Sequence, residues 1–225
     1  MSEINKSIES VRGAWIDSPY YETAEQWTHL FWKQDAIFKI YFDQIDVSNS
    51  AELACGHGRH SEQLLQKYAN RVSHLYCLDV IESNVDFTRK RLSSFSNVEC
   101  LLIAGRDFQP IPSDSLTSIF CYDAMVHFNP DVVQSYLADA FRVLMPGGRA
   151  LFHHSNLDAP KTGVSGYAQN PHARNHMPFN LFESFVAEAG LRILEAQAIR
   201  WGQLPNLDRI SLLERPTRNA FKALS

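Results

Sequence analysis

Apolar residues follow two patterns along this chain: short continuous runs, and longer stretches in which they recur every three or four positions. The short runs predict strands, and the spaced stretches predict amphipathic helices. Strands are expected at the run that ends near residue 52 and at residues 73–78, 98–103, 116–122 and 149–152. Helices are expected at residues 61–68, 82–92 and 130–144. Strands that alternate with helices predict an α/β fold built on a mostly parallel sheet with helices on both faces.

The two ends of the chain depart from this alternation. Residues 1–19 are mixed, and the spacing over residues 23–42 predicts one aromatic-rich helix. Near the C-terminus a helix is expected at 179–189, and the two apolar runs after it predict an antiparallel strand pair. The pattern predicts one domain over residues 1–225, divided into an N-terminal helical lid or extension at 1–45, a core at 46–214 with a candidate substrate loop at 155–178, and a C-terminal tail at 215–225.

Composition is that of an ordinary globular protein, with 45% hydrophobic and 20% charged residues and a net charge of −4. This balance and the lack of a dense Lys/Arg run argue against nucleic acid as a partner. The start of the chain lacks an apolar signal core, and no apolar stretch reaches membrane-spanning length, which predicts a cytoplasmic protein without a membrane partner. Cysteines stand singly at Cys55, Cys77, Cys100 and Cys121, without the spacing of a metal site or a disulfide framework.

Candidate chemistry begins with a glycine loop between the first predicted strand and the helix after it. The loop reads Glu-Leu-Ala-Cys-Gly-His-Gly-Arg-His over residues 52–60, and Asp79 follows about twenty residues after it. A carboxylate at this spacing accepts the hydroxyl groups of a ribose, so an adenosine-containing cofactor is expected. A dinucleotide fingerprint would carry a third glycine where this chain has Ser61, so a nicotinamide-dependent oxidoreductase remains as an alternative.

The pattern resembles the class I S-adenosylmethionine-dependent methyltransferases, in particular bacterial enzymes that act on small molecules. The resemblance rests on the acidic, small-Cys-Gly-x-Gly motif from Glu52, on Asp79, on the Pro-Gly-Gly turn at 146–148 and on the closing strand pair, and it covers residues 48–214. It implies a Rossmann-like, doubly wound sheet of seven strands, mostly parallel with a C-terminal antiparallel pair. It also implies S-adenosyl-L-methionine as the cofactor.

The resemblance further implies a cofactor site, carried over position by position. Its expected members are Glu52, Ala54, Cys55, Gly56, Gly58, Asp79, Val80, Gly105, Arg106, Asp107 and Asp123. Asp79 would bind the ribose and Val80 would pack on the adenine. Either Asp107 or the backbone of Arg106 would contact the adenine. Ala54 stands where the family often has glycine, which costs little if its φ is negative.

Histidines near strand exits are the candidate catalytic groups. Methyl transfer to a hydroxyl needs a base, and His127, His153 and His154 are the candidates. Adjacent strand residues point to opposite faces, so at most one of His153 and His154 faces the site, and His154 is favoured because it lies nearer the strand exit. Each of these histidines also has an ordinary structural interpretation as a packing or hydrogen-bonding residue.

The substrate contacts are expected on the N-terminal lid and on the long loop, at Tyr21, His172 and Arg174. The turn at Asp123 lacks the Pro-Pro-aromatic motif of enzymes that methylate bases, which argues against DNA or RNA as the substrate. The sequence therefore predicts methylation of a small molecule, a sugar or secondary metabolite, at oxygen rather than nitrogen, without a metal. The pattern is compatible with a homodimer, and a non-catalytic methyltransferase-like partner subunit is the second alternative.

Overall fold

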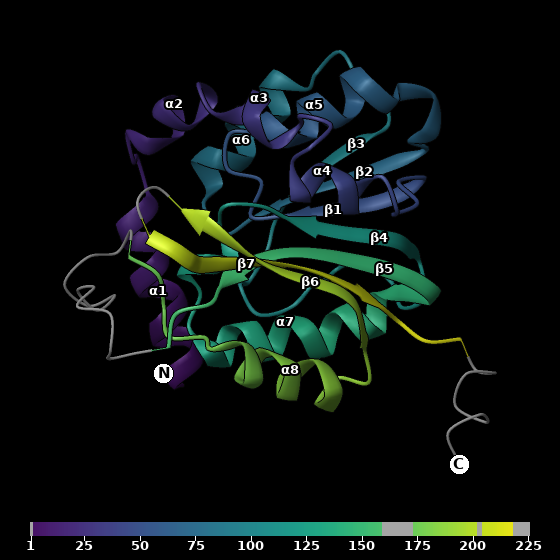
Figure 1. The fold of residues 1–225 in the computed structure, drawn as a ribbon. Helices are drawn as coiled ribbons and strands as arrows, with labels where there is room; N and C mark the ends of the chain where they lie inside the picture. The colour runs from purple at the N-terminus through teal and green to yellow at the C-terminus, as the bar shows by residue number, and fades with distance from the viewer. Residues whose placement is uncertain (1, 159–172, 202–203, 218–225) are drawn as a thin grey trace.

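The computed structural model describes residues 2–158, 173–201 and 204–217, and a single seven-stranded sheet forms its centre (Figure 1). The strands are β1 Asn49–Leu53, β2 His74–Asp79, β3 Val98–Leu102, β4 Leu116–Cys121, β5 Leu144–Ser155, β6 Arg192–Trp201 and β7 Leu204–Glu214. Their order across the sheet is β3-β2-β1-β4-β5-β7-β6. Neighbours from β3 to β5 are parallel, whereas β7 runs antiparallel to both β5 and β6. The predicted fold class is confirmed.

Helices cover both faces of this sheet (Figure 1). They are α1 Glu3–Trp15, α2 Tyr20–Glu25, α3 Thr28–Phe31, α4 Ile37–Phe42, α5 Arg59–Tyr68, α6 Glu82–Arg91, α7 Pro130–Val143 and α8 Phe179–Glu188. One face packs against α7 and α8, and α1 contacts α7 at the edge of that layer. The other face packs against α4, α5 and the end of α6.

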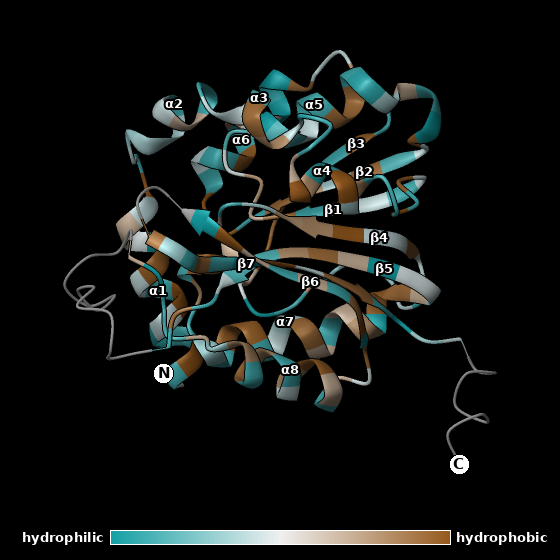
Figure 2. Cartoon of the chain, viewed as in Figure 1, coloured by the Kyte–Doolittle hydropathy of each residue, from teal (hydrophilic) through white to brown (hydrophobic). Residues whose placement is uncertain are grey.

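Two separate apolar cores result, one on each side of the sheet. The first holds Phe108, Tyr136 and Phe182, and the second holds Phe38, Phe42 and Phe120, all at most 1% exposed. In Figure 2, brown predominates along β4 and β5 at the centre of the sheet, and brown and teal segments alternate along α7 and α8. Burial of this apolar surface on both faces is the main driving force for a parallel sheet.

The N-terminal segment differs from the sequence prediction. Residues 3–15 form a regular helix, α1, within the segment predicted as a helical lid or extension, although the sequence pattern located no individual helix there. The Ser2 side chain accepts a hydrogen bond from the Asn5 backbone N–H, which satisfies a free donor of the first turn. Ile4, Ile8 and Trp15 recur at helical spacing, and the last two are buried.

The predicted single helix over residues 23–42 is also wrong, because this segment forms three short helices, α2, α3 and α4. The chain turns after Phe31, and Trp32 is directed inward, where it is 3% exposed and packs on Phe42 with ring centroids 4.9 Å apart. The polar residues 33–35 form the turn. A straight helix could not bury these aromatic rings on one side, so tertiary packing overrides the local pattern.

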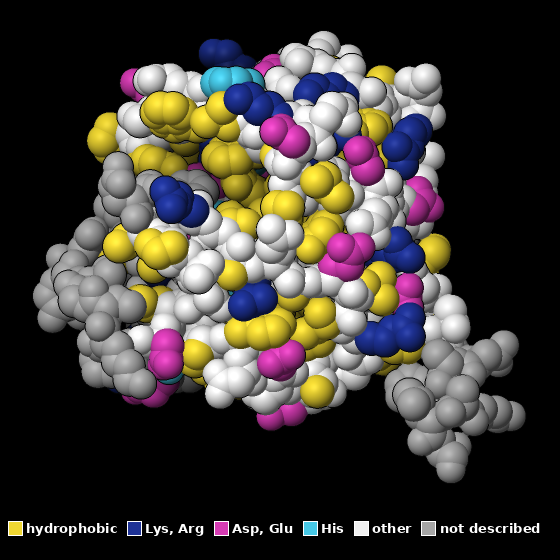
Figure 3. Space-filling model, in the orientation of Figure 1, with side chains coloured by type: hydrophobic (Ala, Val, Ile, Leu, Met, Phe, Trp, Pro, Cys, Tyr) yellow, Lys and Arg dark blue, Asp and Glu magenta, His cyan; other side chains and the backbone are white. Residues whose placement is uncertain are grey.

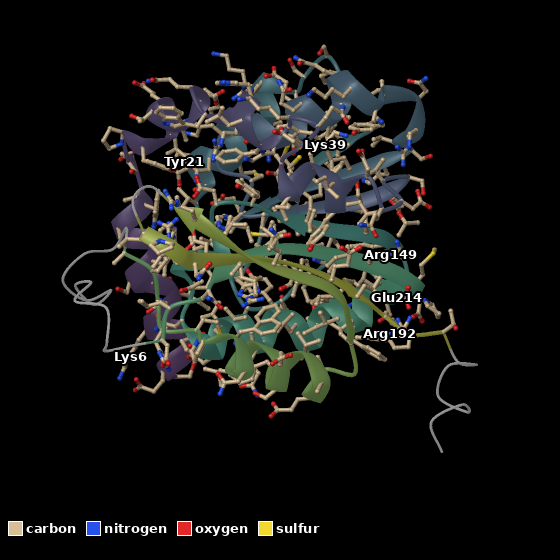
Figure 4. All side chains as sticks on the ribbon, in the orientation of Figure 1. Lys6, Tyr21, Lys39, Arg149, Arg192 and Glu214 are labelled. Atoms are coloured by element: carbon tan, nitrogen blue, oxygen red, sulfur yellow. The ribbon has the colours of Figure 1, made fainter. Side chains whose placement is uncertain are left out.

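Strand β5 begins at Leu144, five residues before its predicted start. Gly147 has a φ of 85°, and its N–H donates to the Arg215 carbonyl oxygen at 2.7 Å, which extends the sheet through the Pro-Gly-Gly turn. At the same end of the sheet Glu214 lies between Arg149 and Arg192, with N–O distances of 3.6 and 2.6 Å (Figure 4). Among the described residues, no helix is long and apolar enough to cross a membrane.

Candidate functional site

A cavity lies at the carboxyl ends of β1, β2 and β4, under a cover formed by α1 and α2. Its empty space is about 1030 Å³ when the opening to solvent is included. Tyr21 lies below α2, on the side that faces the strand ends (Figure 4). The lining is mostly apolar and contains a few polar groups, which is the usual character of a site for a small ligand.

The glycine loop after β1 forms one wall of the cavity. Three of its residues have positive φ: Ala54 at 56°, Gly56 at 54° and Gly58 at 75°. A Cβ atom on Gly58 would lie 2.8 Å from Thr88 Cγ2, so this position requires glycine for space as well as for conformation. The φ of Ala54 is not negative, contrary to the condition set by the sequence analysis. An alanine held there is strained by about 1 kcal/mol.

Asp79, at the end of β2, is the buried carboxylate beside this loop, with 4% of its surface exposed. Its Oδ2 accepts a hydrogen bond from the Gly56 N–H at 2.9 Å, and its Oδ1 accepts from the Ile81 N–H at 2.9 Å. Burial raises the pKa of Asp79, and these backbone hydrogen bonds oppose the shift. Asn84 Nδ2 also donates to Oδ1, at 3.2 Å, so the carboxylate is fixed at the cavity wall and Oδ2 keeps capacity for a further donor.

Glu52, on β1, is the second buried carboxyl group of the lining. Burial raises its pKa to about 7, although the Ser61 hydroxyl donates a hydrogen bond to it and Arg59 lies nearby. A carboxyl group in this state accepts a proton or stabilises a cationic group near neutral pH.

Asp123, at the exit of β4, connects the sheet to the helical cover. Its Oδ2 accepts hydrogen bonds from the Tyr20 hydroxyl at 2.6 Å and from Arg59 Nη2 at 2.9 Å. Arg59 also donates to the carbonyl oxygen of Ala24, at 2.7 Å. Asp123 has a φ of 57°, and non-glycine residues in this region concentrate at functional sites.

Further contacts fasten α2 over the cavity. Arg91 binds both carboxylate oxygens of Glu25, at 2.5 and 3.1 Å, and also Glu62, at 2.7 Å. The Tyr21 ring stacks on His57 with centroids 4.4 Å apart, and its hydroxyl accepts from Asn84 Nδ2 at 2.8 Å. The cover is therefore held by specific polar bonds as well as by apolar contact.

His127, in a short 3-10 turn at Met125–His127, lines the cavity on the α1 side. Its Nδ1 lies 3.0 Å from the Ala173 carbonyl oxygen, and a carbonyl only accepts, so Nδ1 carries the hydrogen. Burial and the positive charge of Arg174 lower the pKa of His127 to about 4. The neutral ring therefore keeps a lone pair on Nε2. Trp15 packs beside the ring at 4.9 Å.

His153 and His154 point to opposite faces of β5, as predicted, but neither lines the cavity. His153 accepts a hydrogen bond from the Asp123 N–H and donates to Asp208, which also pairs with Arg174. His154 stacks on Phe182 of α8 with centroids 3.7 Å apart, and burial lowers its pKa to about 3. The preference for His154 as the residue facing the site is wrong, because the pleat turns its ring into the opposite core.

The structure brings most of the predicted site residues to one cavity. Those that line it are Tyr21, Glu52, Ala54, Cys55, Gly56, Asp79, Val80, Gly105, Asp123 and His127. Those that do not are Gly58, Arg106, Asp107, His153, His154 and Arg174. Ile103 and Gly105 line the part of the cavity wall where Arg106 or Asp107 was expected to contact the adenine. His172 lies outside the described residues.

The lining residues that were not predicted include Trp15, Tyr20, Arg59 and His60. The helical spacing of Ile8 and Trp15 is the sequence signal that would have found Trp15, and the position of Arg59 and His60 at the end of the glycine loop is the signal for those two. Within the described ranges no group of three or more His, Cys, Asp or Glu side chains is placed to hold a metal ion. The four cysteines are free thiols.

Comparisons with known proteins agree on the class of domain. Residues 51–148 match a family described as a methyltransferase domain. A tRNA N(3)-methylcytidine methyltransferase of Schizosaccharomyces pombe is 27% identical over 108 residues, which cover 45% of this chain and 34% of that protein. The chain spans 34% to 42% of the length of the curated relatives it matches.

Solved structures extend the similarity to nearly the whole chain. A methyltransferase in complex with the Trm112 methyltransferase activator of Haloferax volcanii has a TM-score of 0.67 and 14% identity, covering 96% of this chain and 99% of that one. An S-adenosylmethionine-dependent methyltransferase of Mesorhizobium loti has a TM-score of 0.62 and 15% identity, covering 79% and 97%. At such identities these structures show a shared fold.

Proposed function

Because residues 51–148 match a methyltransferase domain and the fold is shared with an S-adenosylmethionine-dependent methyltransferase, we propose that this chain transfers the methyl group of S-adenosylmethionine to a small molecule. The observation that carries the proposal is Asp79, a buried carboxylate held by the Gly56 N–H at the end of β2, beside a loop with three positive φ values. A ribose offers two hydroxyl donors to such a carboxylate.

The residues around Asp79 fit the rest of the cofactor. Val80, Ile103 and Gly105 form an apolar slot next to it, suited to the flat face of an adenine. A Cβ on Gly105 would lie 2.7 Å from Ile8 Cγ2 and 3.0 Å from Val80 Cγ1, so this wall has room for glycine alone. On the other side, Glu52 would bind the ammonium group of the methionine end, which would favour its charged form.

The cofactor supplies an activated methyl group on a sulfonium, so the protein must position the nucleophile and accept its proton. We propose His127 for the second task, since its neutral ring has a lone pair on Nε2 that can accept a proton. Trp15 and Tyr20 close the space beside it and limit the entry of water.

A small acceptor is supported by the cover of α1 and α2, which encloses the cavity. On the face in Figure 3, Lys and Arg side chains are scattered among acidic and apolar ones rather than gathered into a basic surface. Both a hydroxyl and an amine satisfy the requirement for a nucleophile with a removable proton. We therefore propose O- or N-methylation, without the earlier preference for oxygen.

A nucleic-acid acceptor is the second candidate, because one relative is described as a tRNA methyltransferase. The same cavity would then have to open to admit a base extruded from its stack.

A protein activator is a further candidate partner, since one structure with the same fold was solved in complex with a methyltransferase activator. Four free thiols fit a reducing compartment, so we place the protein in the cytoplasm.

The test has two stages. Isothermal titration with S-adenosylhomocysteine should give one site per chain with micromolar affinity, and absence of binding at high micromolar concentration would contradict the proposal. The protein is then incubated with methyl-labelled cofactor and either a small-molecule extract or total tRNA. Label in the small-molecule fraction supports the proposal, whereas label in tRNA alone would establish the second candidate.

A further inference from the structure

The cavity wall formed by α5 contains a second buried imidazole, that of His60, for which the proposed reaction has no role so far. His60 is 2% exposed and lines the cavity next to Tyr122, with ring centroids 5.3 Å apart. Tyr122 follows β4, and β1 separates β4 from the strand that carries Asp79. His60 therefore lies on the side of the cavity away from the ribose site, where the methyl acceptor would bind.

The hydrogen on the His60 ring can be assigned from one contact. Trp32 Nε1–H donates to His60 Nδ1 at 3.1 Å, and an indole nitrogen only donates, so Nδ1 must be the acceptor. Burial lowers the pKa of His60 well below its usual value, so the ring is neutral and its hydrogen is on Nε2. His60 Nε2–H is thus a hydrogen-bond donor.

This donor has no acceptor within the part of the chain that the structure describes. An N–H group buried without an acceptor is unfavourable, and native proteins rarely keep one without a reason. Apart from Trp32, the rings of Phe31 and Phe38 surround His60, at 5.9 and 6.2 Å. The Nδ1 atom has a structural role, because phenylalanine at this position would leave the Trp32 indole N–H without an acceptor, whereas Nε2–H has no such role. Trp32 occupies the Nδ1 edge, so Nε2 is the polar atom of this cavity-lining ring that remains for a ligand. Nε2 is buried in the ligand-free structure, so a ligand reaches it only when a neighbouring side chain moves.

We propose that His60 Nε2–H binds a carbonyl or carboxylate oxygen of the methyl acceptor, while His127 Nε2 takes the proton of the nucleophile. This inference rests on the proposed function and adds a substrate class to it. The two imidazoles have opposite hydrogen-bonding character: His127 Nδ1 is anchored by an acceptor, and His60 Nδ1 by a donor. The acceptor molecule then carries two groups, a hydroxyl or amine to be methylated and a separate oxygen that accepts a hydrogen bond.

The test uses the full chain saturated with S-adenosylhomocysteine and three aromatic probes. 2-Hydroxybenzoate has both groups, phenol lacks the carboxylate, and benzoate lacks the hydroxyl. Calorimetry should give at least about tenfold tighter binding for 2-hydroxybenzoate than for phenol, as expected for one charged hydrogen bond. Nitrogen-15 histidine spectra should show the Nε2–H resonance of His60 shifting with 2-hydroxybenzoate and not with phenol.

Variants distinguish a role of His60 in binding the methyl acceptor from a role in packing. His60→Phe should remove the preference for 2-hydroxybenzoate and leave phenol binding unchanged. His60→Gln, whose side-chain N–H reaches a similar position, should retain part of the preference. His29→Ala, at an exposed histidine of α3, should behave as the wild type. The Nε2–H shift in the wild-type spectrum needs no variant and stays informative if His60→Phe fails to fold.

Two results would overturn the inference: equal affinity for the three probes, or an unshifted His60 resonance with every probe, as expected if a water molecule satisfies the donor. Failure of the proposed function is distinguishable from this, because it would appear first as loss of S-adenosylhomocysteine binding. Retained cofactor binding without discrimination among the probes would reject only the role of His60.

Discussion

We propose that one half of the cavity binds the cofactor and the other the methyl acceptor; these two halves, the cofactor half and the acceptor half, are built in different ways. In the cofactor half, Glu52, Gly56 and Asp79 come from two strand ends and the loop between them, and backbone hydrogen bonds hold them. In the acceptor half, Trp15, Tyr20, His60 and His127 come from four separate elements and meet only in the folded chain. The first half is a local backbone arrangement, whereas the second is a product of packing. This difference suggests that the cofactor half tolerates few substitutions and that the acceptor half is where specificity changes.

The halves also differ in how burial changes their ionisable groups. In the cofactor half, burial raises the pKa of Glu52 to about 7, and in the acceptor half it lowers the pKa of His127 to about 4. Both groups are therefore driven toward the neutral form, but from opposite sides of the pH scale.

The largest effect is expected from removing the charge at the centre of the cofactor half. Asp79→Asn should weaken S-adenosylhomocysteine binding by about 100-fold, the loss expected for two hydrogen bonds to a charged group. Asp107→Asn is the matched control, because that carboxylate accepts from the Gln109 N–H outside the cavity lining. Calorimetry measures both, and circular dichroism checks that Asp79→Asn keeps the fold. Normal binding by Asp79→Asn would remove the ribose assignment.

The contribution of Glu52, in the cofactor half, to the free energy of unfolding should fall as the pH rises. In the ligand-free protein the folded pKa of Glu52, about 7, lies above its unfolded value of 4.5, so its stabilising contribution is present below 4.5 and lost as the pH rises to about 7. Relative to wild type, Glu52→Gln should therefore gain about 2 kcal/mol between pH 5 and pH 8. Urea unfolding at the two pH values measures the gain. A difference that does not depend on pH would show that Glu52 is charged in the folded protein.

The contribution of His127, in the acceptor half, to the free energy of unfolding should have the opposite pH dependence. The folded pKa of His127, about 4, lies below its unfolded value of 6.5, so its contribution is present above 6.5 and lost as the pH falls to about 4. Relative to wild type, His127→Gln should gain about 2 kcal/mol between pH 8 and pH 5. Urea unfolding again measures it. Histidine NMR gives an independent check, since a His127 ring that titrates near 6.5 would refute its burial as a neutral base.

The smallest effect tests the strain in the glycine loop. Ala54→Gly should raise the free energy of unfolding by up to about 1 kcal/mol, because glycine adopts a positive φ without a steric cost. Ala51→Gly, within β1 and without a positive φ, should instead lower it. Thermal unfolding compares the two variants. Destabilisation by both would show that the Ala54 methyl group matters more for packing than for strain.

Much of the fold followed from the sequence because strands and helices in a parallel sheet leave local signals. The apolar runs located β2, β3 and β4 to within a residue or two, and Gly56 with Asp79 located the cofactor half. The N-terminal region did not follow, because α2, α3 and α4 are shaped by where their aromatic rings are buried. A periodic pattern indicates a helix, but it does not tell where tertiary packing bends the chain.

The adjacent histidines of β5 show which properties followed from the sequence and which depended on the tertiary structure. The sequence alone determined that His153 and His154 point to opposite faces, since the pleat of a strand requires it. It also predicted an adenosine-containing cofactor, because the glycine loop and Asp79 are held by backbone geometry at a short separation along the chain, and the family resemblance added the expectation of S-adenosylmethionine. Only the tertiary structure decided that His154 stacks on Phe182 and that His60 and His127 reach the cavity. The direction of a side chain at a site assembled from distant elements depends on the packing of those elements, which no local pattern encodes.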